Sequence, residues 1–221
     1  MPPSFRFVTR LSGVLVGLAG ALLASAELGA QGQTSLPRLL AAELGPVPWN
    51  VRSGGIAAYD VRLDEAGAVA SAEMVQDVAP YGCMLGKALP SWRFEPARAE
   101  GRAVPSRVLV LGFFRPPELH FAAPANPRYK DTVAPDEIPW PTHVTVAPYP
   151  PSALGSGYVV LEADVSESGT VTGTRRLSPT TPFDSAATEA ARQWTFRPAS
   201  REHRDVASRA FLVFSFVGTT P

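Results

Sequence analysis

The stretch WRFEPA at residues 92–97 returns as WTFRPA at residues 194–199. Sliding the chain over itself by 102 positions aligns residues 48–114 with residues 150–216 without a gap, and 17 of the 67 pairs are identical. Unrelated sequences would agree at only a few positions. The period exceeds the roughly 20 to 50 residues of stacked repeat units. The pattern therefore predicts a domain duplication with two small, separately folded copies.

The second copy has the clearer strand pattern. Residues 157–166 alternate between apolar and acidic side chains, which is typical of a strand with one buried face. Gly169 is free to take a positive φ in the short turn that follows. Residues 170–177 are rich in β-branched side chains and are predicted to return as the hairpin partner. The expected buried side of the first strand consists of Val159, Leu161, Ala163 and Val165, opposite Glu162 and Asp164.

A helix is predicted after each hairpin. In the second copy Thr181 is a capping residue, Pro182 suits the first helical position, and Asp184 completes a capping box. Pro90 interrupts the first helix, which is expected to kink or end early. Apolar residues recur at helical spacing in both copies. They are Phe183, Ala186, Ala187, Ala190, Ala191 and Trp194, matched by Tyr81, Met84, Leu85, Ala88, Leu89 and Trp92.

Apolar last strands complete the copies, at residues 104–114 and 205–217. Each copy is thus predicted to be a β-β-α-β unit in an α+β fold, a three-stranded antiparallel sheet with one helix packed on it. Units of about 70 residues bury little surface, so large side chains have to fill their cores. The predicted core residues come from the two repeated corners: Trp92, Phe94, Pro96, Trp194, Phe196 and Pro198.

The predicted boundaries place a first domain at residues 46–116, a linker at 117–147 and a second domain at 148–218. Eight prolines fall within residues 116–148, a composition typical of an extended, semi-rigid spacer. The run Ile138-Pro139-Trp140-Pro141 offers an alternative, in which part of this segment docks on a domain surface.

The N-terminus has the pattern of an export signal. Arg6 and Arg10 precede an uncharged apolar run at residues 11–26, and the small residues of Ala24-Ser25-Ala26 suit a signal peptidase. We expect cleavage near Ala26, giving residues 1–26 as a signal peptide. The alternative is a retained anchor, although the run is shorter than the roughly 20 residues of a spanning helix. No later stretch is long enough to cross a bilayer.

Charge and cysteine content exclude several classes of partner. The chain has 20 basic and 20 acidic residues, and loss of Arg6 and Arg10 leaves a net charge of −2. This balance argues against nucleic acid, which requires a dense basic face. Cys83 is the single cysteine and has Ser185 as its counterpart, so an intrachain disulfide is impossible.

Catalytic and metal-binding patterns are lacking in the sequence. The three histidines, His120, His143 and His203, are spread along the chain without metal-ligand spacing. We expect neither an enzyme nor a bound cofactor or metal. Arg107 and Arg209 begin equivalent last strands, where a charge either contacts an acidic peptide or glycan or prevents unwanted strand pairing. The second role is favoured.

Several features together resemble the C-terminal domain of TonB, the energy-transducing protein of Gram-negative envelopes. They are the pair Tyr149-Pro150, the Ser168-Gly169 hairpin, the helical stripe, the Trp194 corner and the closing apolar strand. The resemblance covers residues 148–217 well and residues 46–115 more loosely, with Val47-Pro48 in place of the Tyr-Pro pair.

The resemblance implies protein binding in the periplasm. Domains of this type use a sheet edge to pair with a segment of an outer-membrane transporter, which is β-augmentation. Carried onto this chain, the edge is the last strand, with Tyr149 and Pro150 as a secondary contact. Its residues are Ser208, Arg209, Ala210, Phe211, Leu212, Val213, Phe214 and Ser215.

The chain departs from an energy transducer in two ways. The apolar N-terminal run has no histidine, and the Pro-rich segment lies between the copies instead of after that run. The leading hypothesis is therefore a periplasmic module that binds envelope proteins without transducing energy. The alternatives are a membrane-anchored TonB-like transducer and a peptidoglycan-binding or structural envelope protein. Exposed strand edges would also allow a homodimer.

Overall fold

A computed structural model describes residues 34–45, 54–77, 79–114, 135–177 and 181–218. All of them belong to one compact unit, Gln33–Pro221. The predicted signal peptide and residues 117–134 of the predicted linker lie outside the described residues. None of the helices in the described ranges is long and apolar enough to cross a membrane.

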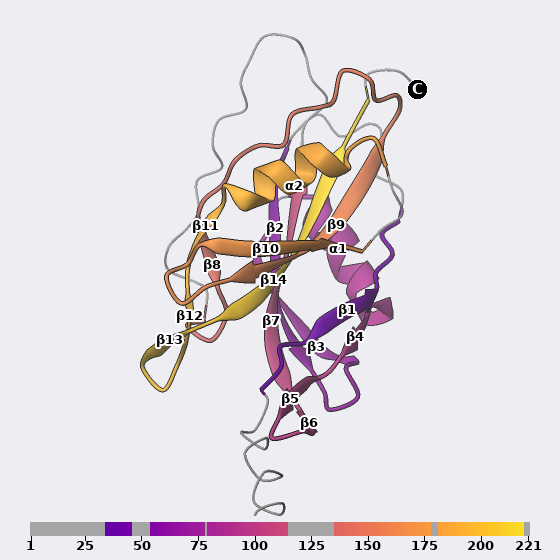
Figure 1. The fold of residues 1–221 in the computed structure, drawn as a ribbon. Helices are drawn as coiled ribbons and strands as arrows, with labels where there is room; N and C mark the ends of the chain where they lie inside the picture. The colour runs from indigo at the N-terminus through magenta and orange to yellow at the C-terminus, as the bar shows by residue number, and fades with distance from the viewer. Residues whose placement is uncertain (1–33, 46–53, 78, 115–134, 178–180, 219–221) are drawn as a thin grey trace, which may run out of the picture. The chain divides into compact units, whose positions relative to one another are not determined.

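The described part of each half contains seven strands and one α-helix (Figure 1). The first half consists of β1 (Arg38–Ala41), β2 (Gly55–Leu63), β3 (Val69–Gln76), α1 (Tyr81–Ala88), the 3-10 turn η1 (Leu89–Ser91), β4 (Arg93–Glu95), β5 (Ala97–Ala99), β6 (Arg102–Val104) and β7 (Ser106–Phe114). The second half consists of β8 (Trp140–His143), β9 (Gly157–Val165), β10 (Val171–Arg176), α2 (Asp184–Arg192), β11 (Thr195–Arg197), β12 (Ala199–Arg201), β13 (Arg204–Val206) and β14 (Ser208–Phe216).

Every strand of the second half begins 102 residues after its counterpart in the first half. The correspondence includes β1 and β8, which precede the stretch that aligns in sequence. The sequence comparison missed this pair because Arg38-Leu39-Leu40-Ala41 and Trp140-Pro141-Thr142-His143 share no residue.

The two halves share one six-stranded sheet, in the order β10-β9-β14-β7-β2-β3 (Figure 1). Neighbouring strands are antiparallel except at the centre, where β7 and β14 run parallel from the pair Leu109–Ala210 to the pair Phe114–Ser215. The prediction of two separate three-stranded sheets is wrong in this respect. Each half has an open edge at its last strand, and the two edges satisfy their backbone groups by pairing with each other.

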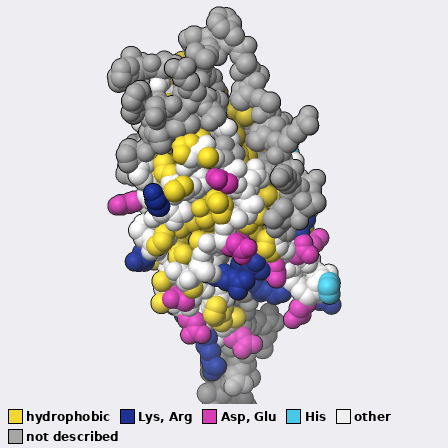
Figure 2. Space-filling model, turned by 180° about the vertical axis from the view of Figure 1, so that it is seen from behind, with side chains coloured by type: hydrophobic (Ala, Val, Ile, Leu, Met, Phe, Trp, Pro, Cys, Tyr) yellow, Lys and Arg dark blue, Asp and Glu magenta, His cyan; other side chains and the backbone are white. Residues whose placement is uncertain are grey.

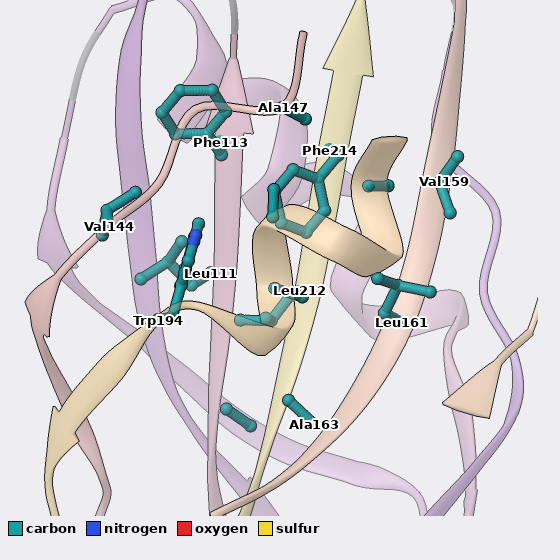
Figure 3. Close-up of a cluster of buried hydrophobic side chains, with 14 of the residues drawn as sticks. Leu111, Phe113, Val144, Ala147, Val159, Leu161, Ala163, Trp194, Leu212 and Phe214 are labelled. Atoms are coloured by element: carbon teal, nitrogen blue, oxygen red, sulfur yellow. The ribbon is translucent and has the colours of Figure 1, made fainter. Parts of the chain in front are cut away.

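One hydrophobic core lies on each face of the sheet, and both halves contribute to both cores. The core under α2 contains Trp194 together with Leu109, Leu111 and Phe113 of the first half (Figure 3). The core under α1 contains Trp92 together with Val160, Phe211 and Val213 of the second half. Side chains alternate between the faces of a strand, so each of the central strands β7 and β14 supplies both cores. The halves therefore do not have independent interiors.

The strand β9 is buried on both faces, whereas the alternating pattern predicted burial on one. Val160 and Glu162 have 1% and 3% of their surface exposed. The face that was expected to meet solvent is covered because it belongs to the core under α1. Glu162 tolerates burial because the guanidinium of Arg175 donates to both of its carboxylate oxygens.

The helices agree with the predicted periodicity and differ at their starts. The helix α2 begins at Asp184, three residues after the expected cap. One of the two bonds of the predicted capping box is present: the Asp184 carboxylate accepts from the Thr181 amide at 2.9 Å. Thr181 Oγ1 accepts from the Phe183 amide at 3.3 Å and not from the amide of Asp184. The helix α1 ends at Ala88, and Pro90 lies in the 3-10 turn η1, as expected for an interrupting proline.

Part of the predicted linker is folded onto the second half. The strand β8 pairs with β11, and Ile138, Trp140, Val144 and Ala147 are buried in the core under α2. The prediction that residues 135–147 form an extended spacer is thus wrong. The alternative, in which this segment docks on a domain surface, is correct for these residues. Burial of the apolar side chains at these positions is favourable. The prolines reduce the conformational entropy that the segment loses when it is ordered.

The two Trp corners have matching surroundings. Trp92 Nε1 donates to Glu43 O at 3.2 Å, and Trp194 Nε1 donates to Thr145 O at 2.9 Å. Gly169 has φ +80°, and a Cβ there would lie 1.8 Å from Phe196 O, so this turn requires glycine. Of the six predicted core residues, the four aromatic ones are buried and Pro96 and Pro198 are half-buried.

Candidate protein-binding surfaces

The strand predicted to bind a partner lies in the middle of the sheet. The strand β14 pairs with β9 on one side and with β7 on the other. Its backbone groups are therefore occupied, and the expectation of a free edge at residues 208–215 is contradicted. The sequence could not reveal this because both copies present the same apolar last strand, and only the assembled sheet shows that each is the partner of the other.

The side chains of β14 are also unavailable to a partner. Those of the residues from Ala210 to Phe214 have at most 1% of their surface exposed. Ser208 and Ser215 are buried as well. Arg209 Nη2 lies 2.7 Å from Asp164 Oδ1. The strand is a structural centre and not a docking surface.

The predicted secondary contact packs within the chain. The Tyr149 ring lies 5.5 Å from the Phe183 ring, and its hydroxyl donates to Gly155 O at 2.7 Å. Pro150 O accepts from the Ala153 amide at 3.0 Å. Both residues are half-buried at the end of the core under α2.

Arg107 and Arg209 do not protect a free edge. Arg107 Nε donates to both oxygens of Asp60 at 2.8 Å, and its Nη1 lies 3.0 Å from Glu137 Oε2. The hydrogen bond to Asp60 raises the pKa of Arg107, with burial opposing it. The favoured role for these two arginines is therefore wrong, because the strands they begin are paired on both sides.

The outer strands of the assembled sheet are β3 and β10. The edge at β10 carries features that discourage pairing. Arg175 donates to Glu162 and to Leu39 O, and Arg176 Nη1 lies 2.6 Å from Asp184 Oδ2 at the start of α2. Charged side chains are a common way of protecting an edge. Register irregularities do not distinguish the two edges, because they occur in both the β10–β9 pair and the β3–β2 pair.

The edge at β3 is the more open of the two. The strand has eight residues, and those from Ala70 to Met74 are all exposed. It contains no proline and no basic residue, and Glu73 is its only charge. Among the described residues, no strand pairs with the outer side of β3. An isolated bridge joins Ala68, the residue before β3, to Arg93. An edge of this kind is a template for another strand.

One large hydrophobic side chain of this strand, that of Met74, reaches the surface. Met74 is 48% exposed, and Leu40 and Leu154 are the other large exposed hydrophobic residues among those described. Figure 2 shows hydrophobic side chains in patches broken by single charges on the side turned away from the viewer in Figure 1. A peptide paired with β3 would cover part of the Met74 side chain.

Tyr59 holds β3 and α1 together. Its hydroxyl lies 3.4 Å from Met74 Sδ and donates to Gly82 O at 2.8 Å. Burial raises the pKa of Tyr59 above the ordinary value of 10.0, with smaller contributions from Asp77 and Cys83. Burial raises the pKa of Tyr81 in the same core.

The contribution of Tyr59 and Tyr81 to stability is therefore expected to be constant below pH 10.0 and to fall above it. In that range the unfolded chain releases tyrosine protons that the folded chain retains, so ionisation favours unfolding. Urea unfolding between about pH 8 and about pH 12 measures the effect. Tyr59→Phe should flatten the decline, while Tyr149→Phe is the control for loss of a hydroxyl elsewhere. An equal decline in wild type and Tyr59→Phe would contradict this role.

The other candidate groups remain apart. His143 lies at the end of β8, His203 lies in the turn between β12 and β13, and His120 is outside the described residues. Cys83 is exposed on α1. In the parts of the chain that the structure describes, no three His, Cys, Asp or Glu side chains come together at a position that could hold a metal ion.

These features define a small α+β protein in which strand-helix-strand elements form one sheet with two outer edges. Residues 148–217 match the family model described as the Gram-negative bacterial TonB protein C-terminal, and they carry a domain of this family. The match runs from just before β9 to just after β14. The resemblance seen in the sequence is thereby confirmed for the second half. None of the curated proteins compared with the chain matches it.

Proposed function

We propose that this protein is a periplasmic module of the Gram-negative envelope that binds a segment of another envelope protein as an added strand along β3. The family of residues 148–217 supports a TonB-like role in the envelope. The exposed edge at β3 is the observation that carries the binding mode. Main-chain hydrogen bonds along the edge would supply affinity, and contacts with Met74 and its neighbours would supply selectivity.

The proposed partner is a segment of an outer-membrane transporter. In the proposed arrangement the partner pairs with the first half, whereas the sequence pointed to the second half. The intramolecular pairing of β7 with β14 supports this change, because it uses the last-strand edges of both halves. We further propose export with cleavage near Ala26, a role without energy transduction, and no enzymatic activity.

Proline substitution in β3 tests the binding mode. Alternate amides of an edge strand point toward the neighbouring strand and away from the sheet. Of Ser71→Pro and Ala72→Pro, one should therefore remove an amide that donates to β2 and destabilise the protein. The other should remove an amide that points away from the sheet and leave the fold intact. The variant that keeps the fold is expected to bind transporter-segment peptides about tenfold more weakly, because proline has no amide to donate and its ring obstructs the edge.

Binding is measured by fluorescence anisotropy with labelled peptides from the periplasmic segments of outer-membrane transporters. The matched controls are Gly173→Pro and Thr174→Pro in β10, again taking the variant that keeps its fold. Undiminished binding by the folded β3 variant would refute pairing at β3. A dimer that the same variant converts into monomers would show that the edge pairs with a second copy of the chain instead.

A further inference from the structure

The parallel pairing of β7 with β14 creates a groove at one end of the sheet. Because the two strands run in the same direction, both begin at this end of the sheet (Figure 1). The hairpins β5–β6 and β12–β13, which precede them in the chain, therefore both contribute residues to the groove wall. A groove of about 700 Å³ lies at the starts of the two strands. We call it the arginine groove, after Arg62, Arg98, Arg107, Arg201 and Arg209 in its wall. Antiparallel pairing would have placed the hairpins at opposite ends.

The arginine groove is basic within a chain that has equal numbers of acidic and basic residues. Its five arginines face one acidic residue in the wall, Glu137. Asp60 and Asp164 add two carboxylates behind Arg107 and Arg209, so five positive charges meet three negative ones. Arg62, Arg98 and Arg201 are exposed and have no carboxylate partner among the described residues. Arg98 donates to Gly101 O of its own hairpin at 3.1 Å, so the three guanidinium groups have no ionic partner among the described residues and keep donors for an acidic ligand.

Two buried hydroxyl groups lie at the same place. Ser106 and Ser208, the first residues of β7 and β14, both belong to the groove wall. Their Oγ atoms are buried and have no hydrogen-bond partner among the described residues, and Ser208 is 9% exposed. A buried hydroxyl without a partner is uncommon in a folded protein. A small rearrangement on binding would let each hydroxyl donate to a carboxylate or a peptide carbonyl.

The remaining wall is mostly apolar, with Thr34, Ser35 and Ser200 as its other polar residues. Leu36, Val104 and Val206 are half-buried and contribute apolar surface to it. A purely ionic site for a small anion would not require this surface. An apolar floor between arginines fits an extended peptide that alternates acidic and apolar side chains, because guanidinium groups bind carboxylates in a fork geometry and apolar side chains are withdrawn from water.

We propose that the arginine groove binds an acidic peptide segment of a partner protein. The site is built jointly by the two halves and does not depend on the function proposed for the β3 edge, although Arg62 in its wall pairs with Ser71 of β3. After the proposed cleavage near Ala26, residues 27–33 directly precede the groove wall at Thr34 and carry Glu27 as their single charged residue. One carboxylate does not match three exposed arginines, so the proposed occupant is a segment of another chain.

The test uses the full chain and a fluorescein-labelled peptide of alternating glutamate and valine, with glutamine and lysine versions as controls. The glutamate peptide is expected to bind at least about tenfold more tightly than the other two, and its binding should weaken with salt. Amide NMR shifts should change near Ser106 and Ser208. The triple variant R62Q/R98Q/R201Q changes only exposed side chains and should reduce binding about tenfold.

A matched triple variant, K87Q/R93Q/R192Q, changes exposed basic residues outside the groove wall and should bind as the wild type does. Equal binding of the three peptides, or equal binding by the two triple variants, would overturn the proposal. Displacement of the peptide by muropeptides at lower concentration would overturn the assignment to a protein partner in favour of a glycan. Loss of binding in the folded β3 proline variant, together with undiminished binding by R62Q/R98Q/R201Q, would place the peptide at β3 instead of the groove, since Arg62 pairs with Ser71.

Discussion

Trp194→Ala is expected to lower the free energy of unfolding by about 3–5 kcal/mol, the usual cost of truncating a buried aromatic residue. The indole is 1% exposed, its Nε1 donates to Thr145 O, and its ring lies 5.3 Å from Phe214 and 6.3 Å from Phe113. Phe113 belongs to the first half. The loss should therefore destabilise both halves together, in one unfolding transition.

Urea unfolding followed by far-UV circular dichroism, with hydrogen exchange of amides in β2 and β9, measures this outcome. Trp194→Phe keeps an aromatic ring but loses the Nε1 donor and part of the indole volume, so a loss of stability smaller than that of Trp194→Ala is expected. Two separate transitions, with β2 protected after β9 has exchanged, would show that the halves unfold independently and would contradict the shared core.

Phe211→Ala is also expected to lower the free energy of unfolding by about 3–5 kcal/mol, because it truncates a buried aromatic residue. Its effect falls on the core under α1, which Phe211 enters from the second half. Phe211 is fully buried under α1 and meets Phe94 of the first half at 5.0 Å in an edge-to-face arrangement. A double-mutant cycle between Phe94→Ala and Phe211→Ala should give a coupling energy of about 0.5–1.5 kcal/mol.

The control cycle pairs Phe211→Ala with Phe183→Ala. Phe183 lies in the core on the opposite face of the sheet, so the two losses should add within about 0.5 kcal/mol. A Phe94–Phe211 coupling no larger than this control would mean that the two halves do not share a core in solution.

The two proposed binding surfaces both follow from the central strand pair. The pairing of β7 with β14 occupies the last-strand edges of both halves and leaves β3 and β10 as the outer strands. It also brings together the N-terminal ends of β7 and β14, where the arginine groove lies. The β3 edge recognises backbone, and the arginine groove recognises charge. Proline variants in β3 and glutamine variants in the groove therefore separate the two functions experimentally.

Several local features could be read from the sequence because they depend on neighbouring residues. The hairpin at Gly169, the end of α1 before Pro90 and the apolar stripe of α2 are set by backbone conformation and helical periodicity. The capping bond of Thr181 with Asp184 was also predictable, although the helix itself begins later. The family of residues 148–217 was visible in the same patterns.

The sequence by itself determined the hairpins, the two helices and their apolar stripes, since periodicity and turn chemistry act over short distances. The burial of both faces of β9 and of residues 138–147 depends on the assembled sheet. Only the tertiary structure decided which strands meet. An apolar last strand satisfies its free backbone groups equally well with a partner protein or with the matching strand of the other half. The intramolecular partner is held at high local concentration by the chain, so β14 pairs with β7 and the surfaces left for other proteins lie elsewhere.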